Sequence, residues 1–317
     1  MSGLWTNSTL QFWTALTGTL FSLYAVTNTA RFAWNFVRPS RLHQYRHADS
    51  GSWALVTGAS DGIGFGFVQE LLAQGFNVLL HGRNRTKLEG LQSDLQKEFS
   101  DQKIDIVVAD ASQYDDSYKA ITEKVRTLPG KLTVLVNNVG GIHTTPTYLP
   151  HQDVPHDDID ACINVNLRFA THLIKDLIPV LRSKGPALLA NIGSVGGIMG
   201  VPYITTYCGT KAYMHVLTES LKNETVAEGI DSIDMVAFLV GNVSSHTNTF
   251  DMPLTITSRQ CAASCLAKAG KNSEALVWGH WKFVIAAYFT MMLPKMTARR
   301  LLGSEMRKRV EAEKKSG

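Results

Sequence analysis

From residue 52 onwards, short apolar runs alternate with longer segments that have the length and mixed polarity of helices. Six apolar runs are present, at residues 53–57, 77–80, 104–109, 132–137, 187–192 and 233–240. Short runs of this kind are typical of strands buried on both faces, and strands that alternate with helices form parallel sheets. The pattern predicts an α/β fold in which a doubly wound parallel sheet is covered by helices on both faces.

The N-terminal stretch has a different pattern. No charged side chain occurs from Ser2 to Ala30, and a helix over residues 10–30 would be about 31 Å long, close to the thickness of a hydrocarbon core. We therefore expect an N-terminal membrane helix. A helix lying in the membrane interface is an alternative, because several threonines make the stretch only moderately apolar. A cleaved signal peptide fits less well, since no basic region precedes the apolar residues.

These patterns divide the chain into an anchor with a basic linker (residues 1–50), a main α/β domain (51–272) and a C-terminal extension (273–317). The linker region contains Arg31, Arg38, Arg41 and Arg46. By the positive-inside rule, these arginines place the main domain on the cytosolic side of a membrane.

The C-terminal extension also has features of a membrane protein. Residues 281–293 are apolar apart from Lys282 but too short to span comfortably. We expect them to lie in the membrane interface or to cover a substrate channel, and packing against the core is the alternative. The basic segment that follows suits anionic lipid headgroups or a solvated helix face. It contains Arg299, Arg300, Arg307, Lys308 and Arg309. Lys314 and Lys315, fourth and third from the last residue, resemble the dilysine retrieval signal of endoplasmic-reticulum membrane proteins.

Composition narrows the function classes. A chain of 317 residues with 44% hydrophobic content can bury a full core. Its net charge of +4, without a basic stripe interleaved with aromatic residues, argues against nucleic-acid binding. No metal site is expected, because no cysteine and histidine cluster has zinc spacing. The cysteines form no C-x-x-C pair and are expected to be reduced thiols. They are Cys162, Cys208, Cys261 and Cys265.

A glycine-rich turn, GASDGIG at residues 58–64, follows the first predicted strand and leads into a helical pattern. Glycines allow a tight turn and close approach of the backbone to a pyrophosphate, whose charge is favoured by the N-terminus of the helix. Strand, glycine turn and helix in this order predict a Rossmann-type dinucleotide site. The residues of the turn that we assign to the cofactor are Gly58, Ser60, Asp61, Gly62, Ile63 and Gly64.

The end of the second predicted strand indicates which cofactor is bound. An enzyme that uses NAD usually has Asp or Glu there for the ribose 2′-hydroxyl, whereas an arginine can bind the 2′-phosphate of NADP. This chain reads His-Gly-Arg-Asn at residues 81–84, with Arg83 placed for a phosphate. We therefore predict NADPH, with Arg85 and Lys87 as additional contacts.

A Y-x-x-x-K pair, Tyr207 and Lys211, provides the candidate chemistry. On a helix these side chains are one turn apart on the same face. Ser194 precedes Tyr207 at the end of an apolar run, so serine, tyrosine and lysine could converge as a proton donor for a carbonyl oxygen. Tyr203 is a competing tyrosine, but it lies two helical turns from Lys211.

Together these motifs resemble the short-chain dehydrogenase/reductase superfamily over about residues 52–250. In order, they are TGASDGIG at 57–64, NNVG at 137–140, Asn166, Ser194 and YCGTK at 207–211. More narrowly, the chain is similar to the very-long-chain 3-oxoacyl-CoA reductases, close relatives of the hydroxysteroid dehydrogenases. The features of that narrower resemblance are Asp61, Val139, the membrane-like N-terminus and GHWKF at 279–283.

The resemblance implies catalytic roles for four residues. Tyr207 would donate the proton, Lys211 would be its electrostatic partner, Ser194 would orient the carbonyl, and Asn166 would support a proton-relay water. Because a neighbouring ammonium favours the phenolate, we expect Lys211 to lower the pKa of Tyr207 from about 10.

The resemblance also implies further cofactor contacts. Asp110 and Ala111 would lie by the adenine and Val243 by the nicotinamide amide. The remaining contacts are Asn138, Gly140, Tyr207, Lys211 and Ser245. Many members have a proline after the sixth strand, where this chain reads VGNVSS at 240–245. Residues 246–256 follow this loop and are expected to form part of a substrate lid.

Three functions are consistent with these features. The first is NADPH-dependent reduction of very-long-chain 3-oxoacyl-CoA to 3-hydroxyacyl-CoA in microsomal fatty-acid elongation, at the cytosolic face of the endoplasmic-reticulum membrane and with other elongation enzymes as potential partners. The second is a dehydrogenase of hydroxysteroids or other lipophilic ketones. The third is a non-catalytic nucleotide-binding protein, against which the intact Ser194, Tyr207 and Lys211 argue.

Overall fold

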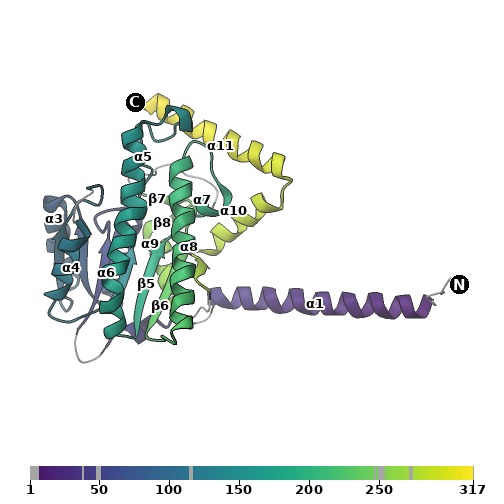
Figure 1. Cartoon of the computed structure of the whole chain (residues 1–317), viewed down its shortest axis with the longest axis horizontal. Coiled ribbons are helices and arrows are strands. Elements are labelled where there is room, and N and C mark those ends of the chain that lie inside the picture. The colour runs from purple at the N-terminus through teal and green to yellow at the C-terminus, as the bar shows by residue number, and fades with distance from the viewer. Residues whose placement is uncertain are drawn as a thin grey trace. The chain divides into compact units, whose positions relative to one another are not determined.

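The computed structural model describes residues 7–37, 39–47, 51–113, 117–245, 248, 254–270 and 274–316. Most of the expected lid at residues 246–256 lies outside these ranges. The chain divides into two compact units, Met1–Pro39 and Ser40–Gly317. The first contains helix α1 (Asn7–Val37), and the second contains the sheet and the other helices (Figure 1).

Helix α1 covers most of the uncharged stretch and continues past Arg31 to Val37, and none of its residues is buried. Among the helices of the described ranges, none is both long and apolar enough to cross a membrane. The expected membrane-spanning helix is therefore wrong. The physical reason is composition: polar residues recur along α1, and the hydroxyls of Thr14, Thr17 and Thr27 donate hydrogen bonds to carbonyls one turn earlier in the same helix.

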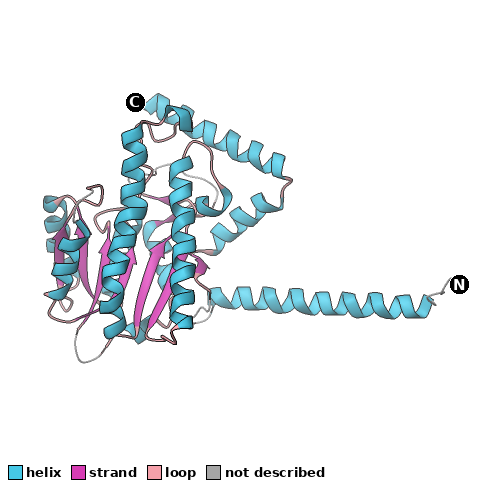
Figure 2. Ribbon diagram, in the orientation of Figure 1, coloured by secondary structure: helices cyan, strands magenta, loops and turns pink. Residues whose placement is uncertain are grey.

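The second unit is built on a seven-stranded parallel sheet (Figure 2). Its strand order is β3-β2-β1-β4-β5-β6-β9. The strands are β1 (Ser52–Thr57), β2 (Asn77–Gly82), β3 (Ile104–Val108), β4 (Lys131–Asn137), β5 (Ala187–Ile192), β6 (Ile233–Leu239) and β9 (Leu276–Trp278). The predicted doubly wound fold and its six strands are confirmed. The seventh strand, β9, was missed because three residues at the edge of the sheet give too short an apolar pattern.

Helices cover both faces of the sheet. One face packs against α2 (Gly62–Ala73), α3 (Arg85–Glu98) and α9 (Ser258–Leu266), and the other against α4 (Ser117–Arg126), α6 (Phe169–Ser183) and α8 (Thr205–Ala227). Strand β1 serves both cores: Ala54 and Val56 point to the first face, and Trp53 and Leu55 to the second. This two-sided burial explains why the strand is a continuous apolar run.

Shorter elements surround the carboxyl edge of the sheet. They are α5 (His156–Ile163), the π-helical turn η3 (Asn164–Arg168), α7 (Gly196–Met199), and the paired strands β7 (Val243–Ser244) and β8 (Ile256–Thr257). The 3-10 helices η1 (Leu42–Tyr45) and η2 (His151–Asp153) complete the described elements of this unit, together with α10 (Trp281–Met292) and α11 (Lys295–Ser316).

Residues 40–47 pack along the amino edge of the sheet. Tyr45 is fully buried, and its hydroxyl donates a hydrogen bond to the carboxylate of Asp234 at the start of β6. The Ser40 hydroxyl donates to the Leu266 carbonyl at 3.2 Å, and the Arg46 guanidinium donates to the Gln74 carbonyl at 3.1 Å. This segment is therefore part of the folded second unit.

The two C-terminal helices combine packing with exposure. On α10, Phe283, Val284 and Ala287 are buried, whereas Phe289 and Met292 are 62% and 83% exposed. The helix therefore packs against the core through one face and presents an apolar face to the surroundings.

Helix α11 is attached to two loops at the carboxyl edge. The Glu313 carboxylate accepts hydrogen bonds from the backbone N–H groups of Thr147 at 2.7 Å and Tyr148 at 3.2 Å. Arg309 donates to the Tyr148 hydroxyl and to Asn242 Oδ1, both at 3.3 Å. Part of the basic segment is thus engaged within the fold.

Candidate active site

Residues that lie within four positions after the ends of five parallel strands meet at one edge of the sheet. Gly58 follows β1, Arg83 follows β2, Asn138 follows β4, Ser194 follows β5 and Val243 follows β6. In an open α/β sheet, the carboxyl edge is where ligands bind. The sheet therefore gathers the predicted cofactor residues and the predicted catalytic residues at one place.

The glycine turn has the geometry of a phosphate cradle. Gly58 and Gly62 have φ angles of +64° and +54°, a region that side-chain-bearing residues rarely adopt. A Cβ on Gly64 would lie 2.1 Å from the Gly58 carbonyl oxygen, so the turn can be this tight only with glycine. Because α2 begins at Gly62, its N-terminal N–H groups and dipole favour an anion at the turn. The residues present therefore fit a dinucleotide.

The loop after β4 braces this turn. The Thr57 hydroxyl oxygen accepts hydrogen bonds from the backbone N–H groups of Asn138 at 2.9 Å and Val139 at 3.0 Å. The Asn138 side-chain amide donates to the Thr57 carbonyl at 2.9 Å. Asn138, predicted as a cofactor contact, thus uses its side chain to support the glycine turn.

Other predicted cofactor residues close around the turn. Ser60 and Ile63 are half-buried within it, and Val243 is buried in β7. Asp61 caps α2 by accepting a hydrogen bond from the Gly62 N–H at 2.6 Å. The Cβ of Ser245 lies 3.4 Å from the position that a Gly62 Cβ would take, so the loop after β6 meets the glycine turn.

Beyond β2, Arg83 is exposed at the sheet edge. Within the described ranges, Arg83 forms no ion pair, whereas Arg85 pairs with Glu89 and Lys87 with Asp61. Of the three cations, Arg83 is therefore the one available for a ribose phosphate.

Asp110 lies close to Arg83, and Ala111 beside it is buried. Burial alone would raise the pKa of Asp110, but hydrogen bonds from Ser112 and the charge of Arg83 hold it below its ordinary value. Asp110 is therefore ionised at neutral pH and can accept hydrogen bonds, and its place by the adenine stays a prediction.

Tyr207 and Lys211 lie one turn apart near the start of α8. Lys211 is only 6% exposed, and its Nζ donates a hydrogen bond to the Ile192 carbonyl at 2.7 Å. That Nζ lies 5.7 Å from the centre of the Tyr207 ring. Burial lowers the pKa of Lys211 to about 8.

Ser194 is oriented by its own loop. Its Oγ accepts a hydrogen bond from the Gly196 N–H at 3.1 Å, and its side chain is hydrogen-bonded to that of Tyr207. Burial raises the pKa of Tyr207, and the bond with Ser194 lowers it by less. Tyr207 therefore does not have the net lowered pKa that was expected from the neighbouring Lys211, because burial dominates. The phenol is protonated at neutral pH, as a proton donor must be.

Asn166 lies in the π-helical turn η3 and is 2% exposed. Its Oδ1 accepts from the Gly141 N–H and its Nδ2 donates to the Gly141 carbonyl, both at 2.8 Å. A Cβ on Gly140 would lie 2.6 Å from Asn166 Oδ1 and 3.4 Å from Lys211 Nζ. Asn166 is thus brought close to Lys211 and fixes the loop after β4. Its role towards a relay water stays a prediction.

His215 is a supporting residue that the sequence reasoning missed. Its Nε2 accepts a hydrogen bond from the Ser194 N–H at 3.2 Å. Burial, with the charge of Lys211, lowers the pKa of His215 to about 4, so the imidazole is neutral and can accept. Its place one turn after Lys211 was the available signal, since Tyr207, Lys211 and His215 recur every four residues on one helix face.

This arrangement suits the reduction of a carbonyl group. A neutral phenol and a serine hydroxyl point to one place at the sheet edge, where hydrogen bonds can meet negative charge as it develops on an oxygen. The glycine turn at the same edge provides for a dinucleotide, which would carry the reducing equivalents.

Comparisons with known proteins agree with this geometry. A family model described as short chain dehydrogenase matches residues 52–251. A very-long-chain 3-oxoacyl-CoA reductase of Neurospora crassa is 29% identical over 293 residues, covering 86% of this chain and 87% of that protein. A protein of the same description from Coprinopsis cinerea is 33% identical over 255 residues, covering 77% and 74%.

Solved structures are similar in fold. A structure described in a study of 7β-hydroxysteroid dehydrogenase stereoselectivity has a TM-score of 0.69 at 22% identity. The match covers 80% of this chain and 97% of the chain in that structure. A short-chain dehydrogenase from Sphingobium yanoikuyae in complex with NADPH has a TM-score of 0.63 at 22% identity, covering 76% and 95%. At such identities the likeness concerns the fold alone.

Proposed function

The chain belongs to the short-chain dehydrogenase family of NAD(P)-dependent oxidoreductases, and we propose that it uses NADPH to reduce very-long-chain 3-oxoacyl-CoA to 3-hydroxyacyl-CoA. The observation that carries the proposal is the meeting of Ser194 and the neutral phenol of Tyr207 beside the glycine turn. The substrate class is supported by the description of the relatives, which are similar over most of the chain.

In this mechanism the protein handles the proton. Bound NADPH would supply the hydride that reduces the carbonyl carbon. Tyr207 gives its proton to the carbonyl oxygen, and Ser194 donates a hydrogen bond to the same oxygen while its own Oγ accepts from Gly196. The ammonium of Lys211 stabilises the phenolate that remains until a proton returns from solvent.

NADPH rather than NADH is supported by the end of β2. Arg83 is exposed there without an ion pair in the described part of the chain, and no carboxylate occurs at residues 81–84. A guanidinium binds a phosphate through charge-assisted hydrogen bonds, which a ribose hydroxyl cannot match.

We further propose attachment to the endoplasmic-reticulum membrane at its cytosolic face, where long acyl chains are available and other elongation enzymes would be neighbours. The support is the apolar surface of α1 and the exposed apolar face of α10, which suit a membrane interface.

A substrate panel tests the activity. Purified protein in detergent is mixed with NADPH, and its absorbance is followed with a long-chain 3-oxoacyl-CoA, a short-chain 3-oxoacyl-CoA and a steroid ketone. We expect turnover of the acyl-CoA substrates, with the long chain preferred. Turnover of the steroid alone would instead identify a hydroxysteroid dehydrogenase, and NADPH binding without any turnover would indicate a non-catalytic protein.

A further inference from the structure

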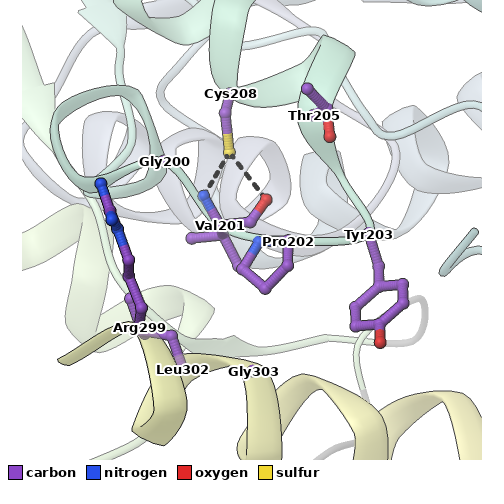
Figure 3. A pocket seen from close by; sticks show the side chains of 9 residues that line it. All are labelled: Gly200, Val201, Pro202, Tyr203, Thr205, Cys208, Arg299, Leu302 and Gly303. Atoms are coloured by element: carbon purple, nitrogen blue, oxygen red, sulfur yellow. Dashed lines mark hydrogen bonds between the residues drawn. The ribbon is translucent and has the colours of Figure 1, made fainter. Parts of the chain in front are cut away.

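A cavity of about 400 Å³ opens between the loop at residues 200–205, Cys208 of α8, and helix α11 (Figure 3). From α11 it is lined by Arg299, Leu302 and Gly303. Its walls are therefore formed by the segment that leads into Tyr207 on one side and by the C-terminal helix on the other.

The cavity adjoins the catalytic groups. A Cβ on Gly196 would lie 3.3 Å from both the Cys208 Sγ in the cavity wall and the Ser194 Oγ. Cys208 is held there by the Val201 N–H, which donates to its Sγ at 3.3 Å. The Cys208 wall of the cavity and the Ser194 hydroxyl therefore both lie beside Gly196.

The lining is apolar with a single cation. Its apolar part includes Val201, Pro202 and Leu302, and no acidic residue lines it. Figure 3 shows Arg299 extending from α11 along the cavity towards Gly200. Within the part of the chain that the structure describes, no carboxylate pairs with Arg299, whose Nη1 donates a hydrogen bond to the Met296 Sδ at 3.8 Å. The cavity is thus suited to an amphiphilic ligand that carries negative charge.

The backbone around the cavity keeps space for a ligand. Gly303 lies within a helix, where glycine costs stability, and nothing would lie within 4 Å of a Cβ placed there. Gly200 is equally open. Tyr203 adopts a φ of +68°, a strained conformation for a tyrosine that is more often found at ligand sites than elsewhere.

We propose that this cavity binds the pantetheine arm of the acyl-CoA and that Arg299 binds its phosphates. The inference rests on the proposed function and extends it to the carrier end of the substrate. The arm combines methylene and methyl groups with amides, which match apolar walls interrupted by the Thr205 hydroxyl and loop backbone. A hydrocarbon chain would make no use of the cation in the lining.

Two carriers of the same acyl group test the role of Arg299. The 3-oxoacyl-CoA and the 3-oxoacyl-pantetheine thioester differ only in the phosphates and nucleotide. We expect Arg299→Gln to raise KM about tenfold for the CoA substrate, as for loss of a hydrogen bond to a charged group, with little change in kcat or in KM for the pantetheine thioester. Arg299→Lys should restore part of the difference. The matched control is Arg300→Gln, which removes an exposed charge outside the cavity lining.

Substitutions of Gly303 test which part of the substrate enters the cavity. Gly303→Leu should raise KM for both carriers by a factor that does not depend on acyl-chain length, whereas Gly303→Ala, which meets no atom, should have little effect. A Leu effect that grows with chain length would assign the cavity to the acyl chain and overturn the proposal.

Other results would also overturn it. If Arg299→Gln changed KM equally for both carriers, or not at all, Arg299 would not contact the phosphates. Unchanged KM together with weaker binding to anionic vesicles would assign Arg299 to lipid headgroups. If the wild-type protein turned over neither thioester, the proposed function itself would fail, which is distinguishable from turnover without an Arg299 effect.

Discussion

The buried ammonium of Lys211 lowers the stability of the fold. Its pKa falls from an ordinary 10.5 to about 8 on burial, and at about 1.4 kcal/mol for each pKa unit, keeping the ammonium protonated in the folded protein costs about 3 kcal/mol. The hydrogen bond from its Nζ to the Ile192 carbonyl offsets part of that cost. We therefore predict that Lys211→Met abolishes the activity without destabilising the protein at neutral pH.

The pH dependence gives the sharper prediction. Below pH 8 the lysine is protonated in both the folded and the unfolded state, so the whole cost is present. Between pH 8 and 10.5 the unfolded state binds a proton that the folded state has released, so the free energy of unfolding of the wild type rises with pH relative to that of Lys211→Met. The difference should change by about 3 kcal/mol across this range and then level off. The variant also lacks the hydrogen bond to the Ile192 carbonyl, which adds a constant to the difference in free energy of unfolding at every pH.

Urea unfolding of the ligand-free proteins at several pH values, followed by fluorescence of the six tryptophans, measures this difference. Lys175→Met is the control, because the Lys175 side chain is 79% exposed and its removal should give a difference that does not change with pH. A flat difference between pH 8 and 10.5 for Lys211→Met, or one of opposite sign, would refute the assignment of Lys211 as a buried charge.

Three further variants test the site and the surface. Tyr207→Phe should lower kcat by roughly a hundredfold or more while NADPH binding, measured by fluorescence titration, is retained, and a preserved rate would rule out Tyr207 as the proton donor. Arg83→Ala should raise KM for NADPH about tenfold and leave KM for NADH unchanged, so an unaltered ratio would count against the 2′-phosphate contact. Phe289→Glu should reduce the fraction of protein that floats with lipid vesicles, because it places a charge on the exposed apolar face of α10. Val226→Glu, at an exposed apolar position on α8, is its control, and equal effects of the two variants would argue against an α10 membrane contact.

The main sheet was predictable because its strands are buried on both faces. The glycine turn, and the spacing of Tyr207 and Lys211, were also readable, since both depend on local backbone geometry at residues close in sequence. Strand β9 was not predictable, because three residues are too few to show an alternating or continuous apolar pattern. Its pairing with β6 depends on register with residues about 40 positions earlier.

The features of the site that were not predictable from the sequence depend on contacts between distant segments. The pKa of Tyr207 is raised because the phenol is buried. The sequence shows the neighbouring lysine but not this burial. Asn138 was assigned to the cofactor, although its amide supports the glycine turn some 80 residues earlier. The wall that α11 contributes to the cavity lies almost 100 residues after the loop that it faces. The membrane-spanning prediction failed for a different reason, because polar residues recur along α1 although the stretch lacks charge.

The packing of residues 40–47 has a mechanical consequence. These residues connect α1 to the catalytic unit, and their contacts with Gln74, Asp234 and Leu266 all lie at the amino edge of the sheet. The candidate active site lies at the opposite edge. A pull transmitted through this connection would be resisted first by the buried Tyr45 and its bond to Asp234, at the edge of the sheet away from Ser194 and Tyr207.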